Sequence, residues 1–232
     1  MTKRPIIPLR RQIPSEGEFH YWKSSGKSIP LTVREEHTIQ FYDKMSLQSI
    51  GVTPERQFWK DQMDDFQRYL KGGSVLDVGC GAGRDLEELA GRGYQCVGID
   101  ASNGMLLHAY LNNPYCVVYN MSMYDLGFPD GYFDGFWSSA SLHHIQKSRV
   151  DLVLGEMRRV TADGGIGFIS VREGRGEFPR HGEEESRIRY FALYHKDELA
   201  DRLTGNGFEI LGDGRKKRGD LIEFIYFFVK RV

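Results

Sequence analysis

The 232-residue chain carries 31 basic and 32 acidic side chains, which leave a net charge of −1 at pH 7. Such a balance provides no overall field that would draw the protein to nucleic acid or to an anionic membrane, although it leaves room for a local basic patch. The length suits one domain with a substantial core, and the longest apolar run, residues 221–229, is too short to span a bilayer.

The N-terminal segment, residues 1–33, is interrupted by prolines and has no sustained hydrophobic period. We expect an arm that is ordered only where it docks, with Tyr21 and Trp22 as its anchors. It contains no apolar stretch of signal-peptide length. The three cysteines of the chain lack C-x-x-C spacing and are odd in number, which is typical of small buried side chains in a reducing compartment. The sequence therefore predicts a cytoplasmic protein without a membrane segment.

Residues 34–232 are expected to form the single domain, and they begin with two helices. Apolar residues recur at helical spacing in residues 34–50 and again in 54–70, where Thr53 and Pro54 form a helix start. Residues 34–71 are therefore predicted to be a pair of N-terminal helices before the first strand.

A glycine-rich loop follows the first predicted strand, residues 74–79. Gly79, Gly81 and Gly83 let the backbone turn sharply and approach a ligand, and the helix predicted over 83–91 presents unpaired N–H groups. The next strand, residues 95–100, ends in Asp100, and an acid at such a strand end can accept hydrogen bonds from both hydroxyls of a ribose. The G-x-G-x-G spacing differs from the G-x-G-x-x-G pattern of dinucleotide sites.

Strands and helices continue to alternate along the rest of the chain. This order predicts a parallel sheet with right-handed crossovers, followed by a C-terminal pair of strands. The predicted elements are helix 102–112, strand 115–120, strand 133–140, helix 148–160, strand 165–171, helix 195–206, strand 208–212 and strand 221–230. The basic residues 215–218 are placed in the turn between the last two strands.

Four motifs resemble those of the class I S-adenosylmethionine-dependent methyltransferases in order and spacing: V-L-D-V-G-C-G-A-G, G-I-D-A-S, F-P-D-G-Y-F-D-G-F and L-H-H-I. The resemblance covers roughly residues 36–232. It implies a Rossmann-like α/β fold: a seven-stranded mixed sheet with an antiparallel last strand, helices on both faces and an N-terminal helical lid. It also implies S-adenosyl-L-methionine as cofactor and S-adenosyl-L-homocysteine as product.

In this family the glycine loop passes beneath the methionyl part of the cofactor, and the resemblance gives Asp77 a role in holding the ammonium group. Ser122 occupies the position where the family often has an aspartate that reads adenine, so its hydroxyl and backbone groups at Met123 are expected to act instead. The complete set expected at the cofactor is Asp77, Gly79, Cys80, Gly81, Gly83, Asp100, Ala101, Met105, Ser122, Met123, Ser138 and Ser139.

His143 and His144 follow the fourth strand and are the candidate catalytic residues. Either could act as a general base for a hydroxyl or amine acceptor near neutral pH. The alternative is that the histidines only pack or shape the pocket, because methyl transfer can proceed by alignment and desolvation alone. The scattered histidines indicate no metal site.

The acceptor is expected to bind beside an insertion at residues 172–194, because loops at this edge of the sheet often carry function. The expected acceptor pocket consists of Tyr21, Trp22, Tyr42, Arg172, Tyr190 and Tyr194. A small molecule is the predicted acceptor. Two alternatives stay open: an RNA methyltransferase of the tRNA wobble-uridine type, against which the near-neutral charge argues, and a cofactor-binding protein without catalysis.

Overall fold

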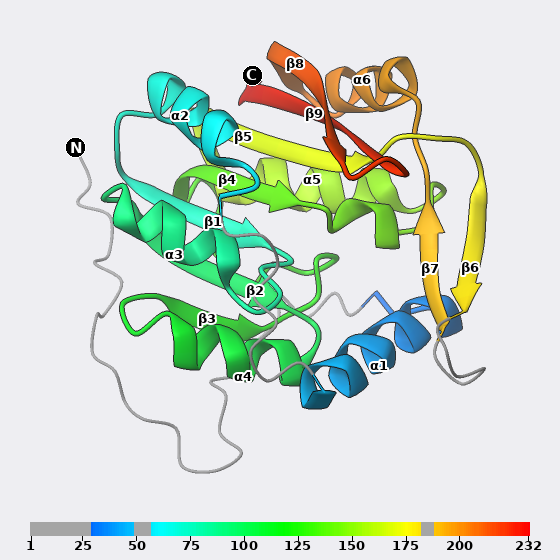
Figure 1. The fold of residues 1–232 in the computed structure, drawn as a ribbon. Coiled ribbons are helices and arrows are strands. Elements are labelled where there is room, and N and C mark those ends of the chain that lie inside the picture. Colours follow the sequence, from blue (N-terminus) through cyan, green and yellow to red (C-terminus); the bar gives the residue numbers. More distant parts are fainter. Residues whose placement is uncertain (1–28, 49–56, 182–187) are drawn as a thin grey trace.

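The computed structural model describes residues 29–48, 57–181 and 188–232 (Figure 1). The expected anchors Tyr21 and Trp22 lie outside the described residues. The helices are α1 (Val33–Gln48), α2 (Lys60–Tyr69), α3 (Arg84–Gly91), α4 (Asn103–Asn112), the 3-10 turn η1 (Leu142–His144), α5 (Val150–Val160) and α6 (Lys196–Gly205). The strands are β1 (Ser74–Val78), β2 (Gln95–Asp100), β3 (Val117–Asn120), β4 (Phe133–Ser139), β5 (Thr161–Arg172), β6 (Glu177–His181), β7 (Ile188–Ala192), β8 (Phe208–Arg218) and β9 (Ile222–Arg231).

Seven strands form one sheet in the order β3-β2-β1-β4-β5-β9-β8. The strands from β3 to β5 pair in parallel, whereas β9 runs antiparallel to both of its neighbours, β5 and β8. The predicted mixed sheet with an antiparallel last strand is thereby confirmed. Because the order reverses between β1 and β4, the carboxyl ends of these strands open a crevice, the usual position of ligand sites in open α/β sheets.

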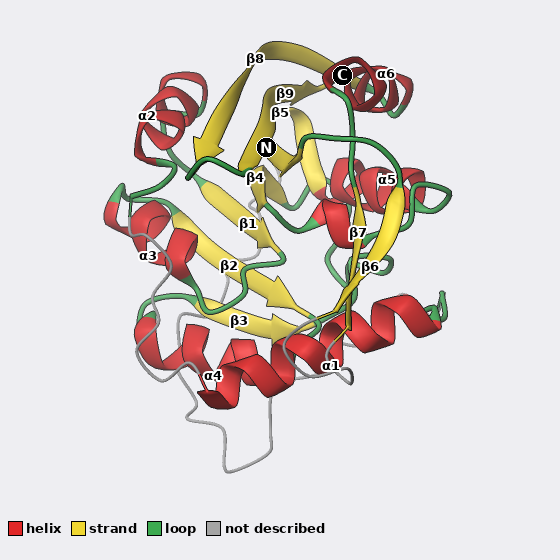
Figure 2. Cartoon of the chain, turned by 45° about the vertical axis from the view of Figure 1, so that its right-hand side comes forward, coloured by secondary structure: helices red, strands yellow, loops and turns green. Residues whose placement is uncertain are grey.

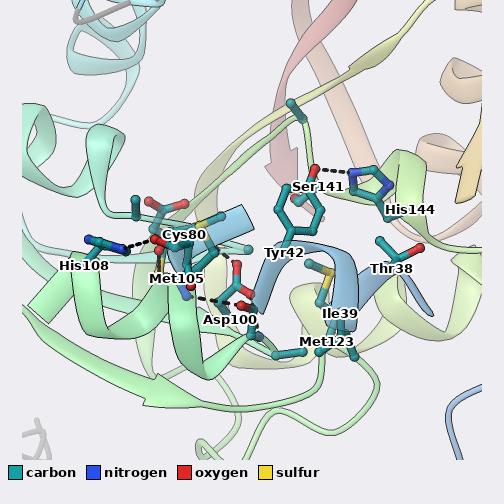
Figure 3. A pocket seen from close by; sticks show the side chains of 18 of the residues that line it. Thr38, Ile39, Tyr42, Cys80, Asp100, Met105, His108, Met123, Ser141 and His144 are labelled. Atoms are coloured by element: carbon teal, nitrogen blue, oxygen red, sulfur yellow. Dashed lines mark hydrogen bonds between the residues drawn. The ribbon is translucent and has the colours of Figure 1, made fainter. Parts of the chain in front are cut away.

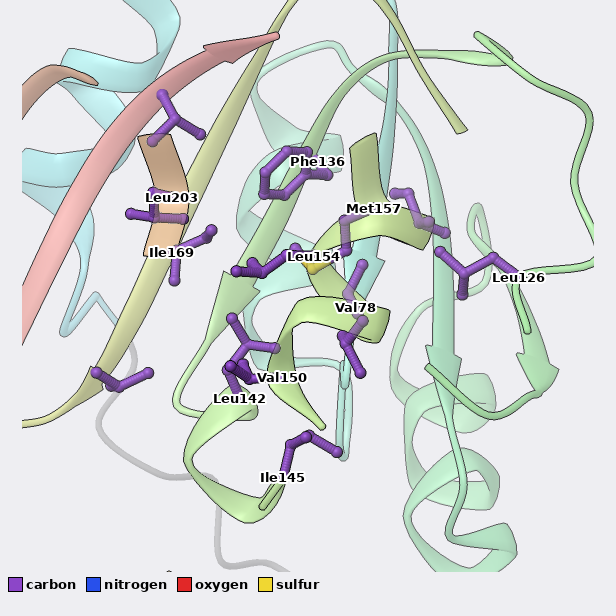
Figure 4. Close-up of a cluster of buried hydrophobic side chains, with 14 of the residues drawn as sticks. Val78, Leu126, Phe136, Leu142, Ile145, Val150, Leu154, Met157, Ile169 and Leu203 are labelled. Carbon is purple, nitrogen blue, oxygen red and sulfur yellow. The ribbon is translucent and has the colours of Figure 1, made fainter. Parts of the chain in front are cut away.

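Helices cover both faces of the sheet (Figure 2). On one face, side chains of α5 and α6 pack on the strands around Phe136 and Ile169 (Figure 4). On the other, α2, α3 and α4 bury a second cluster that contains Trp59, Phe66 and Trp137. All three cysteines are buried and free, as their spacing predicted. The parallel strands are buried on both faces, so their sequences are nearly continuous runs of apolar residues.

Only the first of the two N-terminal helices lies over the crevice. Figure 2 shows α1 crossing the carboxyl edge of the sheet, in contact with α4 and β7, whereas α2 packs on a sheet face near β5. The helical lid is therefore α1. The segment after β5, residues 172–194, was expected to be an insertion, and its described parts include the antiparallel hairpin β6–β7 beside α1.

The basic run was wrongly placed in a turn. Residues 215–218 pair with β9 as the end of β8, and the turn lies at residues 219–221. In the strand, Arg215 Nε donates to Glu173 at 2.7 Å and Lys216 Nζ to Gln62 at 2.8 Å. Tertiary partners on neighbouring elements thus accommodate charges that look like turn residues in the sequence.

Gly155→Ala is expected to stabilise the protein by about 0.5–1 kcal/mol. Gly155 lies in the middle of α5, and a Cβ there would meet no atom within 4 Å. Alanine loses less backbone entropy than glycine when a helix forms. The midpoint of urea denaturation measures the change. Gly98→Ala is the contrasting variant and should destabilise the protein, because its Cβ would lie 2.6 Å from Leu86 Cδ1. A Gly155→Ala protein that is less stable than wild type would contradict the prediction.

Candidate active site

A cavity of about 810 Å³ lies at the carboxyl edge of the sheet beneath α1. Its wall combines the glycine loop after β1, the ends of β2 and β4, the start of α4 and one side of α1 (Figure 3). Twelve of the predicted site residues line it: Tyr42, Asp77, Gly79, Cys80, Gly81, Asp100, Ala101, Met105, Ser122, Met123, Ser139 and His144. Segments distant in the sequence thus meet around one space.

The glycine loop has its shape because three of its residues adopt positive φ angles. The φ values are 77° at Gly79, 54° at Gly81 and 83° at Gly83, a region that is costly for residues with a Cβ. A Cβ on Gly79 would also lie 2.5 Å from the Cβ of Ser141. At Gly81 a Cβ would meet no atom within 4 Å, so the backbone there borders open cavity space.

Asp100 ties the glycine loop to the start of α4. Its Oδ2 accepts a hydrogen bond from Gly81 N at 2.9 Å, and its Oδ1 accepts one from Ser102 N at 2.8 Å. Burial raises the pKa of Asp100, and these backbone donors partly offset the rise. Ser102 caps α4 by accepting from Met105 N at 3.1 Å. The carboxylate is therefore held in one orientation at the cavity wall.

Asp77 is a buried acid whose Oδ2 has no hydrogen-bond partner among the described residues. Only 2% of its surface is exposed, and burial together with the neighbouring Asp85 raises its pKa well above the usual range. An orphaned carboxylate oxygen in a cavity wall is costly unless a ligand supplies a donor. Asp77 thus provides a place for a cation or a hydrogen-bond donor.

Arg84 and Asp85 are functional candidates that the sequence analysis did not assign to the site. Both line the cavity, and the guanidinium of Arg84 forms a bidentate pair with Asp85 at 2.5 and 2.7 Å. Asp85 also accepts from Trp137 Nε1 at 2.9 Å, which fixes the carboxylate from β4. The signal that could have revealed them is an arginine-aspartate pair directly after the glycine loop, at the start of a helix.

Two carboxylates fasten α1 over the cavity, and neither was predicted. Asp43 Oδ1 accepts from Ser102 Oγ at 2.6 Å and from Gly104 N at 3.0 Å, which adds a second cap to α4. Near the other end of α1, Glu35 accepts from Arg149 Nη1 at 2.7 Å and also bonds the hydroxyl of Tyr124. Because both ends of the helix are tied down, α1 holds Tyr42 in a fixed position.

Tyr42 and His144 form a hydrogen-bonded pair in the cavity wall, with Tyr42 Oη and His144 Nε2 2.9 Å apart (Figure 3). His144 Nδ1 lies 2.7 Å from the carbonyl oxygen of Tyr190. A carbonyl can only accept, so we assign the proton to Nδ1, and Nε2 then accepts from the tyrosine. Burial lowers the pKa of His144 to about 4 and raises that of Tyr42, so both groups are neutral at pH 7.

His143 does not reach the cavity. It is 3% exposed, stacks on Phe191 with ring centroids 5.4 Å apart, and its Nδ1 accepts from Arg172 N at 3.3 Å. Successive residues of a 3-10 turn point to different sides, so only one of the two histidines can line the cavity. His143 therefore has a packing role, and the structure leaves His144 as the candidate base.

Five other predicted residues also lie outside the cavity wall. The side chain of Ser138 points behind the loop, where its Oγ lies 2.8 Å from Ser141 Oγ. Gly83 is the N-cap of α3 and packs against α4. Tyr190 and Tyr194 are 1% and 0% exposed and belong to the core. Arg172 lies beyond His143, with its guanidinium over Phe191. The expected acceptor contacts of the two tyrosines are thus corrected, because their rings fill the interior.

Across the described ranges, no group of three His, Cys, Asp or Glu side chains is arranged to hold a metal ion. None of the helices in those ranges is both long and apolar enough to cross a membrane.

Acidification below pH 6.5 is expected to destabilise the protein through His144. The histidine has a pKa near 6.5 when unfolded and about 4 when folded, so the unfolded state binds more protons between these values. From pH 6.5 to 5.5 the free energy of unfolding should fall by about 1 kcal/mol relative to a His144→Asn variant. Urea denaturation of both proteins at each pH measures this difference. A constant gap between them would show that His144 is protonated normally in the folded state.

The fold and the cavity define a Rossmann-like α/β protein with a nucleoside-type site at the carboxyl edge of its sheet. Residues 76–169 match the family model described as a methyltransferase domain. The chain thus contains a region that matches the methyltransferase-domain family, and its fold is shared with many solved S-adenosylmethionine-dependent methyltransferases.

Two curated relatives share part of the sequence. An uncharacterized methyltransferase of Synechocystis sp. is 35% identical over 120 residues, which cover 52% of this chain and 56% of the relative. The malonyl-[acyl-carrier protein] O-methyltransferase of Erwinia pyrifoliae is 35% identical over 101 residues, covering 43% and 38%. The chain therefore matches only about half or less of the length of these relatives.

Among solved structures, the 1,6-didemethyltoxoflavin-N1-methyltransferase of Burkholderia thailandensis aligns with a TM-score of 0.68 and 18% identity. The alignment covers 92% of this chain and 99% of that protein, which was solved with 1,6-didemethyltoxoflavin and S-adenosylhomocysteine. At this identity the likeness establishes the shared fold, which here includes nearly the whole chain.

Proposed function

We propose that this protein is an S-adenosylmethionine-dependent methyltransferase that acts on a small-molecule acceptor. The observation that carries the proposal is the convergence of three groups on one cavity: the anchored carboxylate of Asp100, the orphaned Oδ2 of Asp77 and the neutral His144. The family match and the substrate-bound structural relative support the same reading.

The cavity residues fit the chemical parts of the cofactor. Asp77 would accept from the methionyl ammonium, because its Oδ2 has no donor among the described residues, and Arg84 would face the methionyl carboxylate. Asp100 would accept from the ribose hydroxyls, and Gly81 leaves room for a ligand to approach the backbone. Ser122 and Met123 remain the proposed adenine contacts. When bound, the cofactor supplies an electrophilic methyl group on its sulfonium.

His144 and Tyr42 would handle the proton of the acceptor. His144 Nε2 carries the lone pair and would accept the proton of the attacking hydroxyl or amine. The acceptor would either take the place of Tyr42 Oη at Nε2 or pass its proton to Nε2 through that hydroxyl. A histidine with a pKa of about 4 is a weak base, which suits acceptors whose proton is acidic or whose attack is assisted by desolvation. The helix α1 would exclude water by covering the cavity.

Calorimetry with S-adenosylhomocysteine tests the cofactor assignment. We expect it to bind, and we expect neither NAD nor ATP to displace it at comparable concentration, because the loop lacks both the dinucleotide spacing and a phosphate-binding lysine. Transfer of labelled methyl from S-adenosylmethionine to a library of small metabolites then tests the activity. Labelling of tRNA alone would support the RNA alternative, and binding without any transfer would support a non-catalytic role.

A further inference from the structure

Two arginines near the Tyr42–His144 pair share one aromatic ring. The guanidinium carbons of Arg172 and Arg189 lie 5.0 and 5.4 Å from the ring centroid of Phe191. The same ring lies 4.9 Å from the ring of His144. Phe191 thus places two cations beside the histidine that lines the cavity.

Arg189 also reaches the other member of the pair. Its guanidinium lies 4.3 Å from the ring centroid of Phe41 and 6.0 Å from that of Tyr42, so it is stacked between α1 and β7. Stacking on aromatic faces fixes the plane of a guanidinium and leaves its N–H groups directed outward along its edges. The side chain is therefore held in place beside Tyr42, which lines the cavity, and it is only partly exposed.

Neither arginine forms an ion pair with any carboxylate of residues 29–48, 57–181 and 188–232, whereas most other half-buried arginines there do: Arg84, Arg92, Arg149, Arg159, Arg202 and Arg231. Burial lowers the pKa of Arg172, and repulsion from Arg180 and Arg189 lowers it further. Two partly buried like charges are costly without a counter-ion. An anionic ligand would remove that cost.

We propose that Arg172 and Arg189 bind an anionic group of the methyl acceptor, a carboxylate or a phosphate, while Tyr42 and His144 face its nucleophile. This inference rests on the proposed function and adds the chemical class of the acceptor. Guanidinium groups bind carboxylate and phosphate in bidentate geometry, and the rings of Phe41, Tyr42 and Phe191 hold the two guanidinium groups in place for such a contact.

The test compares probes that differ in charge but hardly in shape. Benzoate, phenyl phosphate and the neutral benzamide are titrated into the full-length protein saturated with S-adenosylhomocysteine, and binding is followed by ligand-detected NMR. We expect benzoate or phenyl phosphate to bind at least tenfold more tightly than benzamide. In Arg172→Gln and Arg189→Gln the affinity for the anion should fall about tenfold or more, consistent with losing one charge-assisted hydrogen-bonding partner, and benzamide should be unaffected. Arg189→Lys should retain part of the anion affinity.

Arg68→Gln is the matched control, because Arg68 lies on α2 and pairs only with Asp65 at 2.6 Å among described residues. It should leave every probe unchanged. Equal affinity of the anionic probes and benzamide would overturn the inference, as would anion binding that persists in both arginine variants. Displacement of benzoate by equimolar tRNA would also overturn it, in favour of a nucleic-acid site.

The affinity for S-adenosylhomocysteine is measured in the wild type and in every variant. A wild-type protein that does not bind S-adenosylhomocysteine would refute the proposed function itself. Intact cofactor binding with no preference for the anionic probes would refute only this inference.

Discussion

Asp77→Asn is expected to weaken S-adenosylhomocysteine binding by about 10- to 100-fold and to stabilise the unliganded protein. The carboxylate is buried, and one of its oxygens has no donor within the described chain. An amide can no longer offer a charged acceptor to the ammonium group, and a charge-assisted hydrogen bond is worth about 1.5–3 kcal/mol. At the same time the substitution removes an uncompensated charge from the interior.

The stability gain should depend on pH in a defined direction. Burial and Asp85 raise the pKa of Asp77 in the folded state. Asp77 therefore lowers the free energy of unfolding most above that folded-state pKa. The effect vanishes in acid, where Asp77 is protonated in both the folded and the unfolded state. Calorimetry with S-adenosylhomocysteine and thermal unfolding at pH 7 and pH 4 measure the two effects. Asp65→Asn, at an exposed carboxylate of α2, should change neither quantity. Unchanged cofactor affinity in Asp77→Asn would remove Asp77 from the site.

Asp100→Ala is expected to reduce affinity for S-adenosylhomocysteine by about 1–3 kcal/mol, which is roughly 5- to 150-fold. The variant loses the proposed ribose acceptor and also frees the backbone N–H groups of Gly81 and Ser102, which Asp100 holds at 2.9 and 2.8 Å. The glycine loop then loses its tie to α4. The measurement is the dissociation constant from calorimetry at pH 7.

Asp100→Asn separates the two contributions of this side chain. Asparagine keeps one oxygen for a backbone donor but turns the other position into a donor, which cannot accept from a ribose hydroxyl. We expect its thermal stability to lie between wild type and Asp100→Ala, with cofactor affinity close to that of the alanine variant. If Asp100→Asn bound the product like wild type, the ribose assignment would be wrong and Asp100 would serve only to hold the loop.

The cofactor side of the site was largely predictable from the sequence. Gly79, Gly81 and Asp100 lie at the ends of strands, and in a parallel sheet the carboxyl ends of consecutive strands meet at one edge. The backbone requirement of a positive φ angle at the loop glycines is local, so residue type alone reveals it. The strand and helix order follows equally from local hydrophobic periods.

The side of the cavity where we propose that the acceptor binds depended on the tertiary structure. Tyr42 and His144 are separated by 102 positions, and no local pattern specifies that α1 brings the phenol to the imidazole. The choice between His143 and His144 follows from the rotation of a short 3-10 turn, and the burial of Tyr190 and Tyr194 follows from the path of β7 and the chain after it.

By itself, then, the sequence determined the α/β architecture, the glycine loop and the acid at the end of β2, because these features depend on interactions within a strand, a turn or a helix. Tertiary structure decided that α1 is the lid, that Asp43 and Glu35 fasten it, and that Arg172 and Arg189 share the ring of Phe191. The physical reason is that side-chain direction and long-range contact are fixed only when elements pack, and packing depends on the whole chain at once.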